Sequence, residues 1–332
     1  NVFEGCTVLE NITFPSGVVS DFALACIGTP WYDTWYNSQP DGVVYIGNVL
    51  HKYKGEMPYR TTIKVKEGTT TIAASAFEDC YDLVDIEIPE SVTSIGEHAF
   101  ERTGFYNSQP DGIIYIGNVL YKYKGEMTAG TTIKVKEGTT EIANRAFIWC
   151  KGLTNVEIPN SVTRIGEDAF NGCYNLTSVT IGNGVTEICE DAFFDCCNLV
   201  DINLPESVCE IEEFAFCNTG LRSVVIPSNI DYIPYSAFLY SSKLKSIIIP
   251  ESVENVTETA FNGCSPYLKV YTPSLNTTSN IGFNNVEMVI QEKVNIQGDL
   301  IFTAEKPYTL VDYAGEDSTV SLPYIYKGEP YE

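Results

Sequence analysis

The stretch that decides the fold is Ile158–Ile181, IPNSVTRIGEDAFNGCYNLTSVTI, because the chain repeats it with small changes. The Phe of its Ala-Phe pair serves as an anchor, and most neighbouring anchors lie 22 or 23 residues apart. Two wider steps, of 51 and 47 residues, interrupt the series. A period of roughly 20 to 50 residues predicts a solenoid, whose successive coils stack on one another. The anchors are Phe3, Cys26 in a degenerate Ala-Cys pair, Phe77, Phe100, Phe147, Phe170, Phe193, Phe216, Phe238 and Phe261.

Each repeat unit predicts one short strand with apolar side chains facing inward. Leu176, Val179 and Ile181 hold the apolar positions, and the Val-x-Ile part alternates with period two. A proline such as Pro159 then ends the strand, because proline has no N–H to donate to a sheet. One unit of this length cannot bury such a stripe alone. The coils must therefore stack into a continuous, quasi-one-dimensional core.

The recurring motif IPxSVTxIGxxAFxxC, at Ile88–Phe100 and Ile158–Cys173, resembles the leucine-rich repeat superfamily. Within it, the motif is similar to the BspA-like, Treponema-pallidum-type subclass of bacterial surface proteins. The resemblance implies a mainly β, right-handed solenoid with a concave parallel sheet and short strands or helical turns on the convex side. It also implies an extracellular or cell-surface location and a role in adhesion or partner binding, since this is the family's usual association.

A second, longer repeat explains the wider steps. Residues 37–57 recur almost unchanged at 107–127, and in each copy two β-rich runs flank a Gly-Asn pair. Gly at the first central position is typical of a tight hairpin turn. We expect two hairpin insertions, each of which either projects from the solenoid or contributes its first strand to the parallel sheet.

We expect two domains. Residues 1–273 form the solenoid with its hairpin insertions, and residues 274–332 form a small antiparallel β segment that acts as a cap or as a linker to a further array. The second expectation rests on short β-rich runs separated by Gly, Asp and Pro. Because the chain begins within a repeat, we expect it to be part of a longer protein.

The composition disfavours several partners. The chain has 44 acidic and 20 basic residues, a net charge of −24, so binding to nucleic acid or to an anionic membrane is not expected. No run of 18 apolar residues occurs, so direct membrane insertion is not expected either. We expect a monomer that binds a protein or glycan ligand on a host or neighbouring cell.

The cysteines point to a repeat position rather than to a disulfide framework. Six of the 11 follow an anchor Phe by three residues, and a core-facing position suits a small buried thiol. Free thiols are expected, although neighbouring coils are close enough for some pairing. Neither a metal site nor a cofactor is expected, because no second Cys pair and only two histidines are present. The six are Cys6, Cys80, Cys150, Cys173, Cys196 and Cys264.

One row of residues should face outward from the concave sheet, between the inward Val and Ile positions. Lys64 should face Glu87, and Lys134 should face Glu157, as opposite charges on adjacent strands. Farther along, the outward row becomes apolar, which favours a partner site lined by Ser223, Val225, Ser246 and Ile248. The alternative is that the row is a purely structural ladder. The row reads Thr13, Lys64, Glu87, Lys134, Glu157, Thr180, Asn203, Val225 and Ile248.

The hairpins offer a second candidate binding surface. Their aromatic residues could recognise proteins or sugars, whereas the simpler interpretation is that they cover the flank of the solenoid. The candidates are Tyr45, Tyr53, Tyr115, Tyr121 and Tyr123.

Catalysis is not expected, because no nucleophile motif, phosphate-binding loop or metalloprotease motif occurs. Two functions remain. The first is a non-enzymatic cell-surface adhesion module that binds through the concave groove or the hairpins. The second is a structural stalk or spacer of a larger surface protein, with no ligand of its own.

Overall fold

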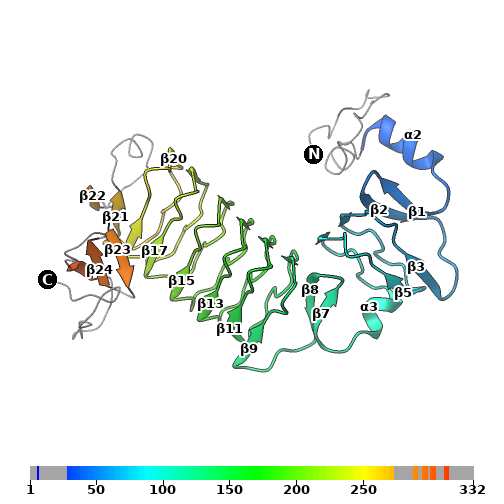
Figure 1. Cartoon of the computed structure of the whole chain (residues 1–332), viewed down its shortest axis with the longest axis horizontal. Helices are drawn as coiled ribbons and strands as arrows, with labels where there is room; N and C mark the ends of the chain where they lie inside the picture. The colour runs from blue at the N-terminus through cyan, green and yellow to red at the C-terminus, as the bar shows by residue number, and fades with distance from the viewer. Residues whose placement is uncertain are drawn as a thin grey trace. The chain divides into compact units, whose positions relative to one another are not determined.

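A computed structural model describes Cys6, residues 28–272 and four strands within residues 287–313. The predictions for Phe3, Thr13 and Cys26 lie outside these residues. The chain forms two compact units, Asn1–Lys124 and Gly125–Glu332. Each unit is built from stacked coils (Figure 1).

In both units the Val-x-Ile positions form parallel strands, here called the long strands. In the second unit Val156 pairs with Val179, and Val179 with Ile202, so equal repeat positions stack directly. This register confirms the predicted coils. The long strands are β3 (Thr61–Lys64) and β5 (Leu83–Glu87) in the first unit, and β9 (Thr131–Lys134), β11 (Leu153–Glu157), β13 (Ser178–Thr180), β15 (Asp201–Asn203), β17 (Ser223–Val225), β19 (Ser246–Ile248) and β21 (Lys269–Thr272) in the second.

A second layer consists of two-residue strands, here called the short strands, before each Ala-Phe pair. They are β4 (Thr71–Ile72) and β6 (Ser94–Ile95), and β10 (Glu141–Ile142), β12 (Arg164–Ile165), β14 (Glu187–Ile188), β16 (Glu210–Ile211), β18 (Tyr232–Ile233) and β20 (Asn255–Val256). Both layers are interrupted in the same place, between β15 and β17 and between β16 and β18. The coil at this place is one residue shorter, since Phe216 and Phe238 are 22 residues apart. The break in both layers therefore coincides with the shorter coil.

The anchor Phe side chains form the core. In the second unit five successive pairs, from Phe147 to Phe261, stack with centroids 5.2 to 5.5 Å apart and ring planes within 12° of parallel. In the first unit Phe77 stacks on Phe100 at 5.5 Å. Because each ring covers the next, a single coil could not bury its own Phe.

A third set of hydrogen bonds joins the coils at the turns around the Ala-Phe pairs. The N–H groups of Arg145, Phe147 and Trp149 donate to carbonyls of the next coil, each at 2.8 Å. These alternating donors need left-handed residues two positions before and after the Phe. The pattern recurs in coil after coil: Ser75 and Asp79, His98 and Arg102, Arg145 and Trp149, Asp168 and Gly172, Asp191 and Asp195, Phe214 and Asn218, and Ser236 and Tyr240 all have φ between 52° and 69°.

The position three residues after the anchor Phe holds a hydrogen-bond donor. The thiols of Cys173 and Cys196 donate to the carbonyls of Phe147 and Phe170, at 3.1 and 3.3 Å. In three described coils a hydroxyl replaces the thiol. Thr103 donates to the carbonyl of Phe100 at 2.8 Å, and Ser241 and Thr219 both donate to that of Phe216, at 2.8 and 3.1 Å. The expectation of free thiols holds for the ten described cysteines. The position is therefore selected for a small donor, and not only for a small apolar group.

Each duplicated segment forms a hairpin, preceded by a helix that ends at the start of the segment. Helix α2 (Pro30–Ser38) precedes β1 (Gly42–Ile46) and β2 (Val49–Lys54), and helix α3 (Gly104–Ser108) precedes β7 (Gly112–Ile116) and β8 (Val119–Lys124). The strands of each hairpin are antiparallel, as predicted. In the first module the second strand, β2, joins the stack by pairing in parallel with β4. This arrangement is neither a free projection nor an insertion of the first strand.

The helices were not predicted, although a local signal for them exists. Thr29 and Thr103 are the N-caps, and their hydroxyls accept the N–H groups of Tyr32 and Tyr106 at 3.2 and 3.0 Å. Pro30 at the first helical position of α2 adds a second signal, because its fixed φ suits a helix start.

Four further strands follow β21. Strand β22 (Glu287–Ile290) pairs in parallel with β21, whereas β23 (Val294–Gln297), β24 (Leu300–Thr303) and β25 (Leu310–Tyr313) form an antiparallel sheet. Strand β23 contacts β17. The domain boundary at residue 273 stays a prediction.

Candidate functional site

The outward row of the long strands begins with ion pairs in each unit. Lys64 lies in register with Glu87 and Lys134 with Glu157, and the Nζ–Oε2 distances are 3.1 and 3.3 Å. The predicted charge pairing is confirmed. All four side chains are more than half exposed, so each pair contributes less than about 1 kcal/mol.

The far end of the outward row is apolar. Val225 pairs in register with Ile248, and Ile248 with Tyr271. The Val225 side chain is 40% exposed, Ile248 is half-buried and Tyr271 is buried. Exposed apolar surface on this row is therefore centred on Val225.

Two residues predicted to line the site at this end are not accessible. Ser223 and Ser246 are 6% and 1% exposed, whereas Ser178, at the same repeat position, is exposed. Ser223 belongs to β17, the strand that β23 contacts, so the C-terminal part of the chain lies close to this end of the row. Sequence alone could not place that strand.

The hairpin tyrosines are engaged within the protein. Tyr121 is buried, and its phenolic oxygen accepts the N–H of Phe100 at 3.2 Å. The phenolic oxygen of Tyr45 accepts the N–H of Lys66 at 3.0 Å. The other three candidates, Tyr53, Tyr115 and Tyr123, are half-buried.

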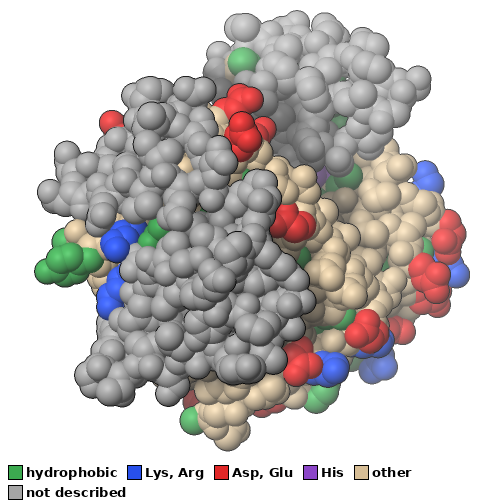
Figure 2. Space-filling view, turned by 60° about the vertical axis from the view of Figure 1, so that its left-hand side comes forward, with side chains coloured by type: hydrophobic (Ala, Val, Ile, Leu, Met, Phe, Trp, Pro, Cys, Tyr) green, Lys and Arg blue, Asp and Glu red, His purple; other side chains and the backbone are tan. Residues whose placement is uncertain are grey.

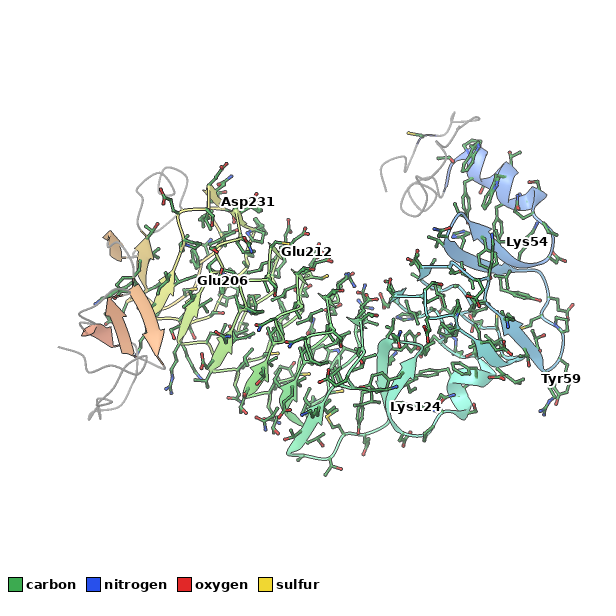
Figure 3. The ribbon with its side chains drawn as sticks, viewed as in Figure 1. Lys54, Tyr59, Lys124, Glu206, Glu212 and Asp231 are labelled. Atoms are coloured by element: carbon green, nitrogen blue, oxygen red, sulfur yellow. The ribbon has the colours of Figure 1, made fainter. Side chains whose placement is uncertain are left out.

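Two hairpin lysines hold the helices. Lys54 donates through Nζ to the carbonyl of Asn37 at 2.8 Å, and Lys124 donates to that of Asn107 at 2.9 Å (Figure 3). The carbonyls belong to the last turns of α2 and α3, where a cation is favoured by the unpaired carbonyls and the helix dipole. The ammonium groups also lie 5.6 and 5.5 Å from the ring centroids of Tyr36 and Tyr106.

His51 is the buried titratable group of the first module. Its Nε2 shares a hydrogen bond of 2.7 Å with the hydroxyl of Tyr32, and the ring is 4% exposed. Burial, followed by the charge of Lys52, lowers the pKa of His51 from 6.5 to about 4. The second module carries Tyr121 at the equivalent position, 70 residues on.

We expect the first unit to lose stability as the pH falls from 6.5 towards 4, the interval between the two pKa values of His51. Above this interval the imidazole is neutral in both states; within it only the unfolded chain binds a proton, so acid favours unfolding. The substitution His51→Tyr, which copies Tyr121, should reduce the difference in unfolding free energy between about pH 7.5 and pH 5. Urea titrations of both proteins measure it. Identical pH dependence in the two proteins would contradict the assignment.

The short strands of the second unit carry a charged row. Arg164 stands between Glu141 and Glu187 in register, with its Nη1 2.6 Å from Glu141 Oε1 and its Nε 3.4 Å from Glu187 Oε1. Arg164 Nη1 also donates to Asn144 Oδ1 at 3.1 Å. The Glu141 side chain is only 3% exposed, so this ion pair lies largely out of water.

Beyond Arg164 the same layer is acidic. A groove of about 440 Å³, here called the acidic groove, carries five carboxylates. Burial, and then Asp168 and Glu190, raise the pKa of neighbouring Asp191 from 3.8 to about 6. Figure 3 marks Glu212 and Asp231, and Figure 2 shows acidic side chains on the face turned to the viewer. The groove is lined by Glu190, Glu210, Ile211, Glu212, Glu213, Asp231, Tyr232 and Pro234.

One cluster of possible metal ligands occurs among the described residues. The donor atoms of Glu187, Cys189 and Glu212 lie within 4.8 Å of one another. Glu187 already pairs with Arg164 and accepts the Cys189 thiol at 3.2 Å. Burial raises the pKa of that thiol, whereas a metal needs the thiolate. The cluster therefore fits a protonated, hydrogen-bonded role better than metal binding.

Within the part of the chain that the structure describes, no helix combines the length and the apolar character needed to cross a bilayer.

The stacked coils and the repeated Ala-Phe turns define a leucine-rich repeat solenoid. The family model of the BspA type leucine rich repeat region matches six copies, over residues 56–175 and 140–269. These ranges cover more than half of the chain, which therefore belongs to the BspA-type leucine-rich repeat family.

Solved leucine-rich repeat structures resemble parts of the chain. A Treponema pallidum leucine-rich repeat protein is 30% identical over 46% of this chain and 72% of its own, with a TM-score of 0.43. A Bacteroides ovatus protein is 26% identical over 69% and 61%, with a TM-score of 0.46. A leucine-rich cell surface protein of Faecalibacterium prausnitzii is 25% identical over 70% and 60%, with a TM-score of 0.37. The chain thus spans about three fifths of the last two. No curated protein matches it.

Proposed function

We propose that this chain is a non-enzymatic adhesion module of a cell-surface protein, and that it binds a protein partner through the apolar end of the outward row. The observation that carries the proposal is the exposed Val225, in register with Ile248 on a row that begins with ion pairs. Desolvation is least costly where a surface lacks charge, and apolar contacts dominate the centre of most protein interfaces. The family's association with adhesion supports the same function.

The charge of the chain favours a partner with a basic surface. The net charge is −24, and the acidic groove of the short-strand layer carries five carboxylates. Such a field accelerates the association of a cationic protein, and added salt weakens this acceleration. The partner we propose therefore combines an apolar centre with basic residues around it.

The proposal assigns no catalytic step and no cofactor. Both histidines have structural neighbours. His51 is buried against Tyr32, and His98, at a left-handed turn position, has its Nε2 beside a carboxylate oxygen of Glu97. Neither lies beside a nucleophile in the contacts described above.

Charging the apolar end tests the proposal. The double substitution Val225→Lys and Ile248→Glu should weaken binding at least tenfold, because two charges would be desolvated at the centre of the contact. Binding is measured by surface plasmon resonance of the chain against a panel of extracellular matrix proteins. Glu87→Ala is the matched control on the same kind of strand, and it should change affinity less than about threefold, since an exposed ion pair contributes little.

The contrary results are distinct. Unchanged binding by the double variant, together with loss of binding by Tyr115→Ala and Tyr123→Ala, would overturn the proposal and assign recognition to the hairpins. If the double variant had a lower unfolding free energy and unchanged binding, the apolar end would serve to pack against the chain's own β23 region. No binding of the unaltered chain to any member of the panel would instead favour the stalk function.

A further inference from the structure

The turn before β11 carries an exposed tryptophan in a left-handed backbone conformation, which the turn requires but a bulky aromatic residue disfavours. Trp149 has φ of 60° and is 52% exposed. Most other residues two positions after an anchor Phe are small or polar, such as Asp79, Asp195 and Asn218. Asn, Asp and Gly tolerate the left-handed region, whereas a bulky aromatic residue there is an outlier. Strain of this kind is a reason to look for a function.

The neighbouring coil holds the indole in place. Gly172 occupies the same position one coil later, and a Cβ there would lie 2.4 Å from Trp149 Cε3. The Tyr174 ring lies beside the indole, with centroids 5.8 Å apart and planes inclined by 51°. Trp149 and Tyr174 are here called the aromatic shelf. Because only glycine leaves room for the ring, the shelf depends on a pair of residues from two coils.

Groups of both charges flank the shelf. Lys151 Nζ lies 5.9 Å from the Tyr174 centroid. Asp195 lies in the coil on the opposite side of Tyr174, because the N–H of Gly172 donates to the carbonyl of Phe194 at 2.9 Å. Burial, followed by the charge of Asp195, raises the pKa of Tyr174. Asp195 in turn accepts the amide N–H of Asn218 at 2.7 Å. A charged ligand would meet attraction on one flank and repulsion on the other, whereas hydroxyl groups can hydrogen-bond to both.

We propose that the aromatic shelf binds a neutral oligosaccharide, with one sugar ring stacked on Trp149. A pyranose has an apolar face of C–H groups and a rim of hydroxyls. The C–H groups suit the electron-rich face of an indole, and the hydroxyls suit the polar flanks. The shelf lies on a turn outside the long strands, so it is separate from the outward row and independent of the protein partner proposed above.

The arrangement occurs twice in the second unit. Tyr240 has φ of 57°, is 62% exposed and lies over Gly263, where a Cβ would be 2.4 Å from Tyr240 Cδ1. The same aromatic-over-glycine pair thus recurs four coils later. We expect this second position to add affinity for longer chains, since a second contact on one ligand raises avidity.

The experiment titrates the full chain with neutral hexasaccharides of glucose (α- and β-linked), mannose, xylose and N-acetylglucosamine, followed by calorimetry. At least one should bind saturably. Trp149→Asn should weaken that binding at least tenfold. Asparagine already occupies the same repeat position at Asn218, so the temperature of thermal unfolding should be unchanged or higher. Trp149→Tyr should bind within about fivefold of the original, because an aromatic face remains. Tyr59→Ala, at an 83% exposed tyrosine of the other unit, should have no effect.

Three results would overturn the proposal. The first is that no hexasaccharide binds saturably, and the second is that sugar binding survives Trp149→Asn. The third is that Trp149→Asn abolishes the binding of a polylysine peptide rather than that of a sugar. The last would assign the shelf to a cationic partner. The Val225→Lys and Ile248→Glu variant should keep its sugar binding, so failure of one proposal is distinguishable from failure of the other.

Discussion

Replacing Arg164 with alanine should lower the unfolding free energy of the second unit by about 3 to 5 kcal/mol, the range for removing one partner of a buried ion pair. Glu141 would then keep a carboxylate that is 3% exposed and has lost its guanidinium at 2.6 Å. Asn144 would lose a hydrogen bond as well. Urea unfolding, followed by circular dichroism of the full chain, measures the effect.

The control removes both charges together. The double variant Glu141→Gln and Arg164→Met should be less destabilised than Arg164→Ala by at least about 1.5 kcal/mol, because the buried carboxylate of Glu141 is removed together with its partner. If the single variant costs less than about 1 kcal/mol, the pair behaves as an exposed one, and the burial argument is wrong.

Truncating the Phe in the middle of the stack should have a comparable effect. Phe193→Ala should cost about 3 to 5 kcal/mol, the usual range for a buried Phe. Its ring is fully buried, with Phe170 at 5.2 Å on one side and Phe216 at 5.5 Å on the other. The cavity would remove stacking contacts from two neighbouring coils, which cannot close the gap without breaking their hydrogen bonds.

A matched substitution near the end of the series provides the comparison. Phe261 stacks on Phe238 at 5.5 Å and is 7% exposed, whereas Phe193 is fully buried, so Phe261→Ala should cost less than Phe193→Ala. Both are measured by urea unfolding at neutral pH. Equal costs at the two positions would show that the greater burial of Phe193 adds nothing to its stabilising effect, which would contradict this prediction.

The regular coils could be predicted from sequence because a fixed period places equal residues at equal positions. Once Val156, Val179 and Ile202 are aligned, their register and the ion pairs between outward residues follow. The period carries no information about segments outside it. Helices α2 and α3 occur in a module present only twice, and pairing of β2 with β4 depends on tertiary packing.

The candidate site was predicted less completely than the fold. Val225 and Ile248 are in register as expected, but the burial of Ser223 depends on a strand about 70 residues later in the sequence. The aromatic shelf was missed because its signal combines two coils. Trp149 stands out only once the left-handed backbone and the glycine of the next coil are both known.

The donor position after each anchor Phe has a consequence for redox behaviour. Cys173 and Cys196 are buried, donate to backbone carbonyls and have raised pKa values, so almost none of either thiol is ionised at neutral pH. Oxidants react with the thiolate, and these thiols present very little of it. Since no described cysteine is paired in a disulfide, the described coils should fold equally well under oxidising and reducing conditions. A long array can therefore cross from one environment to the other without depending on the formation or exchange of any covalent cross-link.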